Sequence, residues 1–179
     1  MKIEKDLVLK VMNGDKTAFS EIYYSCYKDF YKFAFYTIGD AEEAEDVVSD
    51  TFLEIWRGIG RLRKPEAFSS WAFKILSIRC KNAISNIIKS RGEYSYEDFI
   101  ESPIFEIYDT DETFYNNADL AAALLKLEPD ERMIVVLSVL YGYTRREISE
   151  MIGKPRGTVG SKFYRALRKL RKQMGGQQK

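Results

Sequence analysis

The 179-residue sequence contains no histidine, only two cysteines and four prolines, and no apolar run long enough to cross a membrane. The absence of histidine excludes nucleophiles that a histidine activates, of the Ser–His or Cys–His kind, and it excludes acid–base catalysis by imidazole. It also excludes the usual zinc sites. Cys26 and Cys80 fit no ligand spacing and lie in apolar-periodic stretches, so we expect both to be small core residues. These absences exclude most hydrolases and predict a protein with neither a metal nor another cofactor.

The first residues, Met1-Lys2-Ile3-Glu4-Lys5-Asp6, lack the charged-then-apolar layout of a signal peptide, so we expect a cytoplasmic protein that is not embedded in a membrane. A hydrophobic content of 45% is sufficient for a core in one or two small domains. The 28 basic and 27 acidic residues give a net charge of +1, so net charge alone indicates no partner.

Charge nevertheless divides the chain into blocks. From Arg57 to Arg91 nine basic residues accompany a single acid, Glu66. Residues 92–117 contain eight acids and neither Lys nor Arg, and the residues after Thr144 are again mostly basic. We therefore expect two small modules, residues 1–91 and 118–179, joined by an acidic linker over 92–117. This linker is too rich in aromatic rings for a merely flexible tether, so we expect it to be irregular and to dock on a partner.

Apolar periodicity predicts helices along nearly the whole chain, and therefore an all-α fold. In the first module we expect helices over residues 3–12, 16–38, 41–57 and 65–87, the third of them ended by Gly58 and Gly60. In the second module we expect a short helix over residues 120–127 and another that Pro129 opens and Gly142 stops.

A helix-turn-helix follows. Thr144 and Glu147 have the spacing of a capping box, Gly153 supplies a tight turn, and Pro155 suits the first position of the next helix. On that helix one face is apolar and the opposite face is cationic and polar. Such a helix can enter the major groove of DNA, with its first residues at base edges and its cations at phosphates. The alternative is the ordinary solvated face of a helical hairpin.

Three stretches carry a resemblance to a known family. They are YTRREISEMIGKPRGTVGSK from Tyr143 to Lys162, AEDVVSDTFLEIW from Ala44 to Trp56, and FSSWAFKI from Phe68 to Ile75. The first resembles the promoter-reading C-terminal domain of the extracytoplasmic-function (ECF) sigma factors, which belong to the sigma-70 family of bacterial RNA polymerase. The second resembles their core-binding helix, and the third is similar to the segment that follows it. The resemblance covers all but the linker and the termini.

The resemblance implies a sigma factor and not an enzyme. Such a factor binds core RNA polymerase through the beta and beta-prime subunits and directs promoter-specific transcription initiation, here in a stress or envelope response. Its expected partners are core polymerase, promoter DNA and an anti-sigma factor, and it has no small-molecule substrate. The linker corresponds to the connector that passes through the polymerase.

The resemblance also assigns residues. Those that would bind a coiled coil of beta-prime are Asp46, Asp50, Thr51, Phe52 and Trp56. Those that would melt the minus-ten element and hold its bases are Arg61, Arg63, Lys64, Trp71, Phe73, Lys74, Ser77, Arg79 and Lys81, with Trp71 and Phe73 as stacking platforms. Those that would read the minus-thirty-five element are Arg145, Arg156, Thr158, Ser161, Lys162, Arg165 and Arg168. Asp46 and Asp50 at i and i+4 could also suggest a metal pair, but no third ligand is evident.

Three positions depart from the family pattern. Gly160 stands where a basic or polar residue is usual, Lys162 replaces an arginine and loses its bidentate geometry, and Ile78 replaces a common asparagine of the base pocket. Two alternatives remain open, and Gly160 and Ile78 bear on the second of them. One is a stand-alone helix-turn-helix regulator that binds duplex DNA as a dimer without polymerase. The other is a sigma-like decoy that binds polymerase or an anti-sigma factor without initiating.

Overall fold

The computed structural model describes residues 3–90 and 118–174, and every regular element in these two ranges is helical. The N-terminal module (residues 3–90) contains α1 (Lys5–Met12), α2 (Lys16–Ile38), α3 (Ala41–Gly58) and α4 (Phe68–Ser90), with 3-10 turns at Ile59–Arg61 and Pro65–Ala67. The C-terminal module (residues 118–174) contains α6 (Ala118–Leu125), α7 (Pro129–Val139), α8 (Arg145–Ile152) and α9 (Arg156–Met174). The all-α class is confirmed. The predictions for the acidic linker lie outside the described residues, and the domain boundaries stay predictions.

Local signals in the sequence account for most helix ends. The Asp15 carboxylate accepts a hydrogen bond from Ala18 N at 3.0 Å and thereby caps α2, and Asp40 caps α3 in the same way. Gly39 ends α2 with a φ of 87°, a left-handed conformation that favours glycine. Pro65 opens a 3-10 turn rather than the α-helix, which begins only at Phe68. The predicted helix over 65–87 was therefore placed three residues too early.

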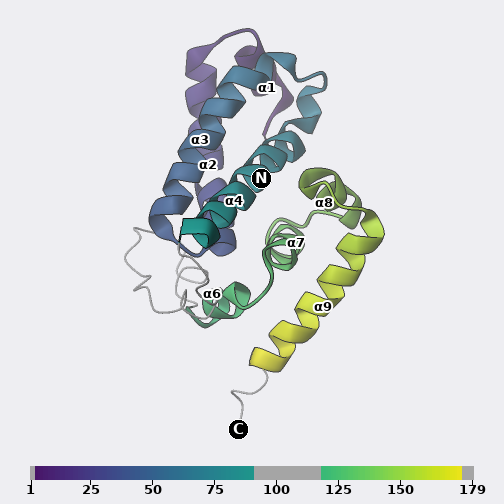
Figure 1. The fold of residues 1–179 in the computed structure, drawn as a ribbon. Coiled ribbons are helices and arrows are strands. Elements are labelled where there is room, and N and C mark those ends of the chain that lie inside the picture. The colour runs from purple at the N-terminus through teal and green to yellow at the C-terminus, as the bar shows by residue number, and fades with distance from the viewer. Residues whose placement is uncertain (1–2, 91–117, 175–179) are drawn as a thin grey trace.

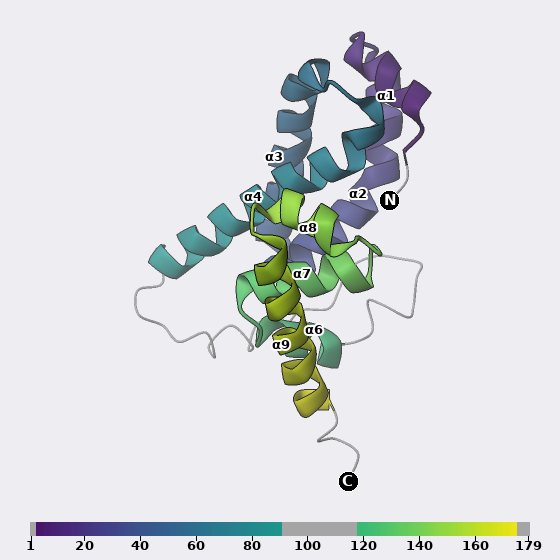
Figure 2. The ribbon, with the colours of Figure 1, turned by 90° about the vertical axis from the view of Figure 1, so that its right-hand side faces the viewer.

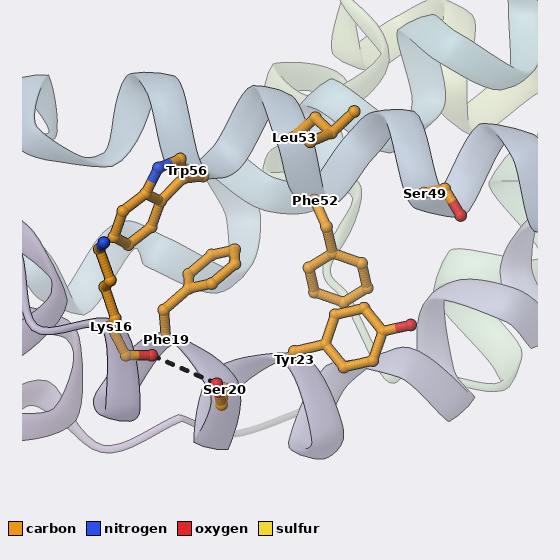
Figure 3. A pocket seen from close by; sticks show the side chains of 8 residues that line it. All are labelled: Lys16, Phe19, Ser20, Tyr23, Ser49, Phe52, Leu53 and Trp56. Atoms are coloured by element: carbon orange, nitrogen blue, oxygen red, sulfur yellow. Dashed lines mark hydrogen bonds between the residues drawn. The ribbon is translucent and has the colours of Figure 1, made fainter.

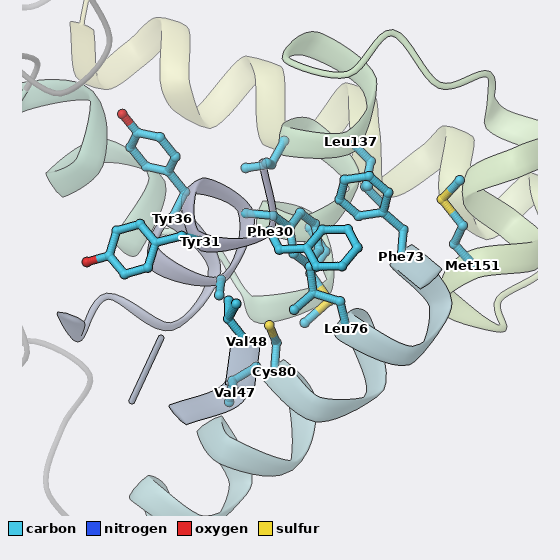
Figure 4. Packing of buried hydrophobic residues seen from close by; sticks show 14 of the residues in the cluster. Phe30, Tyr31, Tyr36, Val47, Val48, Phe73, Leu76, Cys80, Leu137 and Met151 are labelled. Carbon is cyan, nitrogen blue, oxygen red and sulfur yellow. The ribbon is translucent and has the colours of Figure 1, made fainter. Parts of the chain in front are cut away.

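The two modules pack against each other. Helix α8 packs on α4, while α6 and α7 pack on α2 (Figures 1 and 2). One cluster of buried apolar side chains extends from Val8 to Leu170 and includes residues of both modules. Figure 4 shows Phe30 and Phe73 of the N-terminal module beside Leu137 of α7, with Met151 of α8 nearby. The sequence predicts two modules, but it contains no sign that they share a core.

A buried arginine joins the modules. Arg132 of α7 is 0% exposed, and its guanidinium donates hydrogen bonds to the carbonyl of Thr37 and, at 3.0 Å each, to the carbonyls of Leu125 and Leu127. Burial lowers the pKa of Arg132 to about 9, which still leaves the group charged at neutral pH. Thr37 and Leu125 lie in the last turns of α2 and α6, where carbonyls lack helical partners and a positive charge is favourable. Arg132 therefore caps two helices, one from each module.

Both cysteines are core residues, as the sequence predicts. Cys26 and Cys80 are free thiols and fully buried. Burial raises the pKa of Cys26 to about 12 and also raises the pKa of Cys80, so both remain protonated at neutral pH. None of the helices in residues 3–90 and 118–174 has the length and apolar character needed to span a membrane.

Candidate nucleic-acid interface

The helix-turn-helix forms as the sequence predicts. The Thr144 hydroxyl accepts a hydrogen bond from Glu147 N at 3.3 Å, and the Glu147 carboxylate accepts one from Thr144 N at 2.8 Å. Hydrogen bonds from the Thr144 hydroxyl and backbone hold the pKa of Glu147 below its usual value. Gly153 ends α8 with a φ of 68°, and α9 begins at Arg156, one residue after Pro155. The capping box is confirmed, and Pro155 precedes the helix instead of occupying its first position.

Helix α9 has one buried face and one accessible face. Val159, Ala166 and Leu170 are buried, and Phe163 is half-buried. Of the residues predicted to read the minus-thirty-five element, Arg145, Arg156, Ser161, Arg165 and Arg168 are exposed, whereas Thr158 and Lys162 are half-buried. The structure therefore gathers all of these residues on α9 and the start of α8, but it does not leave them equally accessible.

Acids in the first turn of α7, together with its N-cap residue Glu128, neutralise one flank of α9. Lys162 Nζ lies 3.2 Å from Glu128 Oε2 and 3.7 Å from Asp130 Oδ2, and only 19% of the Lys162 side chain is exposed. Further along the helix, Lys169 Nζ lies 2.7 Å and Arg165 Nη1 3.8 Å from carboxylate oxygens of the fully buried Glu131. These cations would have to leave internal partners before they could contact phosphates.

Tyr164 is a surface residue of α9 that sequence reasoning missed. Its ring is 61% exposed, although it directly follows the half-buried Phe163. Arg145 Nη2 donates a hydrogen bond to Tyr164 Oη at 2.7 Å, and the guanidinium carbon lies 4.9 Å from the ring centroid. The sequence places Tyr164 on the cationic face of this helix, away from the apolar stripe, and this placement could have indicated that its ring is exposed.

The residues predicted to bind the minus-ten element are divided between the surface and the interior. Arg61, Arg63, Lys64 and Lys74 are exposed, and Trp71 is half-buried. Phe73 and Ser77 are fully buried. The Phe73 ring lies 4.9 Å from the ring of Tyr141 and 5.5 Å from that of Tyr143, both from the C-terminal module. In this conformation Phe73 is therefore not accessible as a stacking platform.

Arg79 and Lys81, from the same predicted set, already have acidic partners. Arg79 lies 3.2 Å from Asp50 and 2.7 Å from Glu54. Lys81 Nζ lies 3.4 Å from Asp130 and donates to the carbonyl of Ile152 at 3.0 Å, so it bridges the two modules. Ile78, one of the three departures from the family pattern, is 48% exposed.

Asp130 forms ion pairs with three lysines from different parts of the chain. Lys81 and Lys154 lie 3.4 Å and Lys162 lies 3.7 Å from its carboxylate oxygens. Partial burial acts to raise the pKa of Asp130, but the three positive charges and a hydrogen bond from Lys154 outweigh burial and lower it. This carboxylate therefore remains ionised and holds α4, α9 and the turn before α9 to the start of α7.

An apolar groove lies between α2 and α3. It has a volume of about 590 Å³ and is lined by Lys16, Phe19, Ser20, Tyr23, Ser49, Phe52, Leu53 and Trp56 (Figure 3). Phe52 and Trp56 belong to the residues predicted to bind polymerase, and their rings pack against those of Tyr23 and Phe19 at 4.5 Å and 4.8 Å. Leu53, which sequence reasoning missed, is 52% exposed at the edge of the groove. Exposed apolar surface of this kind marks interaction sites.

The other residues of the predicted polymerase-binding set differ in exposure. Asp46 and Asp50 are exposed on α3. Thr51 is fully buried, and its hydroxyl donates to the carbonyl of Val47 at 2.7 Å. Among residues 3–90 and 118–174, no cluster of three or more potential metal ligands is present.

Known proteins are similar to both modules in sequence and in fold. Residues 22–87 match the family model of sigma-70 region 2, and residues 117–170 match that of sigma-70 region 4. The RNA polymerase sigma factor CarQ of Myxococcus xanthus is 30% identical over 132 residues, which cover 74% of this chain and 75% of CarQ. The ECF RNA polymerase sigma factor SigM of Mycobacterium tuberculosis is 26% identical over 172 residues, 96% of this chain and 85% of SigM.

Solved structures agree on the fold. The structure of CnrH in complex with the cytosolic domain of CnrY superposes with a TM-score of 0.72 at 19% identity, over 97% of both chains. The sigma factor RpoE in complex with the anti-sigma factor NepR from Bartonella quintana gives a TM-score of 0.67 at 21% identity, over 89% of this chain and 98% of that one.

Proposed function

The chain belongs to the ECF group of the sigma-70 family, and from this premise we propose which surface of each module binds polymerase and which binds promoter DNA. A member of this family is not an enzyme: it directs RNA polymerase to initiate transcription at promoters. We assign polymerase binding and the minus-ten element to the N-terminal module and the minus-thirty-five element to the C-terminal module. The observation that carries this assignment is an exposed cationic helix α9 in the same chain as an apolar groove beside Asp46 and Asp50.

The groove between α2 and α3 supports the polymerase assignment. Leu53 and Trp56 expose apolar surface, and Asp46 adds negative charge on the same helix, where Asp50 is also exposed but paired with Arg79. An amphipathic helix with basic residues at the edge of its apolar face would complement this surface. The coiled coil of beta-prime is the partner that the family resemblance implies.

For the minus-ten element, we propose that the two modules separate when the chain binds polymerase. Arg61, Arg63, Lys64 and Lys74 are exposed already and can attract the DNA backbone without such a movement. The Phe73 ring packs against Phe30 and Phe33 of its own module on one side and lies under Tyr141 and Tyr143 on the other. Only the side under Tyr141 and Tyr143 can be uncovered for a base, and only after the C-terminal module moves away. The conformation with packed modules is then a form that binds melted DNA poorly.

An anti-sigma factor is a natural regulator of such a protein. One solved structure of similar fold contains a sigma factor bound to an anti-sigma factor. We propose that an inhibitor of this kind stabilises the packed modules of the present chain in the cytoplasm, where the polymerase acts, and that a stress or envelope signal removes it.

Reconstituted transcription tests the assignment. We expect the full chain to give run-off transcripts when it is added to core polymerase and promoters selected from genomic DNA. Asp50→Arg should abolish binding to the core, whereas Asp6→Arg, an equal charge reversal at an exposed position of α1, should not. Absence of initiation on every promoter would refute the proposed function. It is the result expected of a decoy, which binds polymerase without initiating. Tight duplex binding by a dimer that never co-purifies with polymerase would favour a stand-alone regulator instead.

A further inference from the structure

The side chain of Arg145 lies across a helix to which it does not belong. Arg145 is the first residue of α8, yet its guanidinium rests on α9, 4.9 Å from the centroid of the Tyr164 ring. A Cβ atom built on Gly160 would lie 3.9 Å from Arg145 Nη1 and 4.0 Å from Arg145 Cδ. Gly160 and Tyr164 are neighbours one turn apart on α9. The arginine therefore covers the place that a side chain at position 160 would occupy.

We propose that Arg145, although it belongs to α8, reads a base edge from the DNA-facing side of the recognition helix α9. Tyr164 is its positioning residue, and the absence of a side chain at Gly160 leaves room for the arginine. The proposal rests on the proposed minus-thirty-five function of α9. The residues of a recognition helix that meet base edges lie in its first turns, and Gly160 is the fifth residue of α9. At this position α9 itself supplies no side chain, and Arg145 supplies a guanidinium instead.

The electrostatic environment makes Arg145 suited to this role. Lys162 and Arg165 are paired with Asp130 and Glu131 of α7, whereas Arg145 donates a hydrogen bond to the hydroxyl of Tyr164. Within residues 3–90 and 118–174 no carboxylate forms an ion pair with Arg145, so its positive charge is available to a ligand. The ring contact and the hydrogen bond from Nη2 to Tyr164 Oη restrict the rotamers of the arginine, which lowers the entropy lost on binding.

Guanine is the base that fits this group. Its O6 and N7 atoms accept two parallel hydrogen bonds from a guanidinium in the major groove, which is the commonest specific contact of arginine with DNA. A lysine cannot reproduce this planar geometry. The other DNA group that could bind here is a backbone phosphate. Because the guanidinium lies over the exposed side of α9 at Gly160, and not only at the start of α8, we commit to the base edge.

The test is a promoter selection with the full chain bound to core polymerase and a randomised minus-thirty-five element. We expect the wild type to prefer guanine at one position. Arg145→Ala and Arg145→Lys should both reduce that preference by roughly 5- to 150-fold and leave the other positions unchanged. Tyr164→Ala should relax the same position, and Tyr164→Phe, which keeps the ring but loses Oη, should relax it less. Arg146→Ala is the matched control, since Arg146 is an exposed neighbour paired with Glu150 at 3.4 Å, and it should keep the preference.

Three results would overturn the proposal. If Arg145→Ala weakens binding equally for all sequences and reduces the dependence of log K on log salt by about one, the side chain contacts a phosphate. If the preference is unchanged and only thermal stability falls, the Arg145–Tyr164 pair merely joins α8 to α9. A wild-type holoenzyme that selects no minus-thirty-five sequence would refute the proposed function itself, and the proposal with it.

Discussion

Replacement of Arg132 by methionine tests whether the modules fold as one unit. The substitution retains an unbranched side chain but removes the donors to Thr37, Leu125 and Leu127. A buried carbonyl left without a donor costs about 1–3 kcal/mol, and part of this is offset because a charged guanidinium no longer has to be desolvated. We therefore expect Arg132→Met to lower the free energy of unfolding by about 2–5 kcal/mol, in the range measured when one partner of a buried charged hydrogen bond is removed.

Two optical probes can separate the modules in this experiment. The protein has two tryptophans, Trp56 and Trp71, and both lie in the N-terminal module, so selectively excited tryptophan fluorescence reports on that module, whereas tyrosine emission would not. Far-ultraviolet circular dichroism reports on the helices of both. In a urea titration the wild type should give coincident transitions, because one apolar core crosses the modules. In Arg132→Met the dichroism should begin to fall at a lower urea concentration than the fluorescence, because the C-terminal module should unfold before the N-terminal one.

Arg146→Met is the control for Arg132→Met, because the side chain of Arg146 is 71% exposed and its replacement should cost less than about 0.5 kcal/mol. Arg132 does not join the modules if Arg132→Met unfolds with coincident transitions and a similarly small loss of stability. The modules do not fold as one unit if the wild type itself shows two separate transitions.

Three further substitutions test local parts of the account. Gly39→Ala places a Cβ 2.3 Å from Leu125 Cδ2 at a φ of 87°, so urea denaturation should show a loss of about 1–3 kcal/mol. The same substitution should cost less when it is made in a Leu125→Ala background, and no loss in the wild-type background would contradict the described contact. Thr144→Ala should cost about 1 kcal/mol and Thr144→Ser much less, because only alanine removes the cap of α8; equal effects would refute the capping role. Asp130 has a lowered pKa, so its contribution to stability is present above its usual value of 3.8 and is lost as the pH falls through the lower folded value. Denaturation at neutral and acid pH should therefore show a shallower acid loss for Asp130→Asn than for the wild type, and equal slopes would contradict the ion-pair cluster.

The helical modules and the turn between α8 and α9 were predictable because local signals specify them. The caps of α2, α3 and α8 and the glycine ends at Gly39 and Gly153 depend only on residues a few positions apart. Such signals act within a turn or two of backbone, and they leave a readable pattern in the sequence. The helix before α9 and its capping box follow directly from this pattern.

The accessibility of the site residues was not predictable, because residues distant in sequence determine it. Phe73 is covered by Tyr141 and Tyr143, and Lys162 is paired with acids of another helix. Arg132 is charged, and a charged residue is rarely fully buried. The packing of α7 on α2 gives it the Thr37 carbonyl, and the end of α6 gives it the Leu125 carbonyl, and these acceptors compensate for burial. Periodicity assigns residues to a face of one helix but does not identify which helix covers that face.

The distance between the modules, measured with and without core polymerase, shows whether the packed modules separate when the chain binds polymerase. Donor and acceptor dyes can be placed at Thr17→Cys and Arg171→Cys, which are exposed positions of the N-terminal and C-terminal modules. Cys26 and Cys80 are buried, protonated thiols and should not react with the dyes. If the modules separate on binding, energy transfer is efficient in the free protein and falls markedly when core polymerase is added. In Asp50→Arg, which should not bind the core, the transfer efficiency should not change on addition of polymerase. An unchanged transfer efficiency in a wild-type complex that initiates transcription would contradict the proposed separation of the modules.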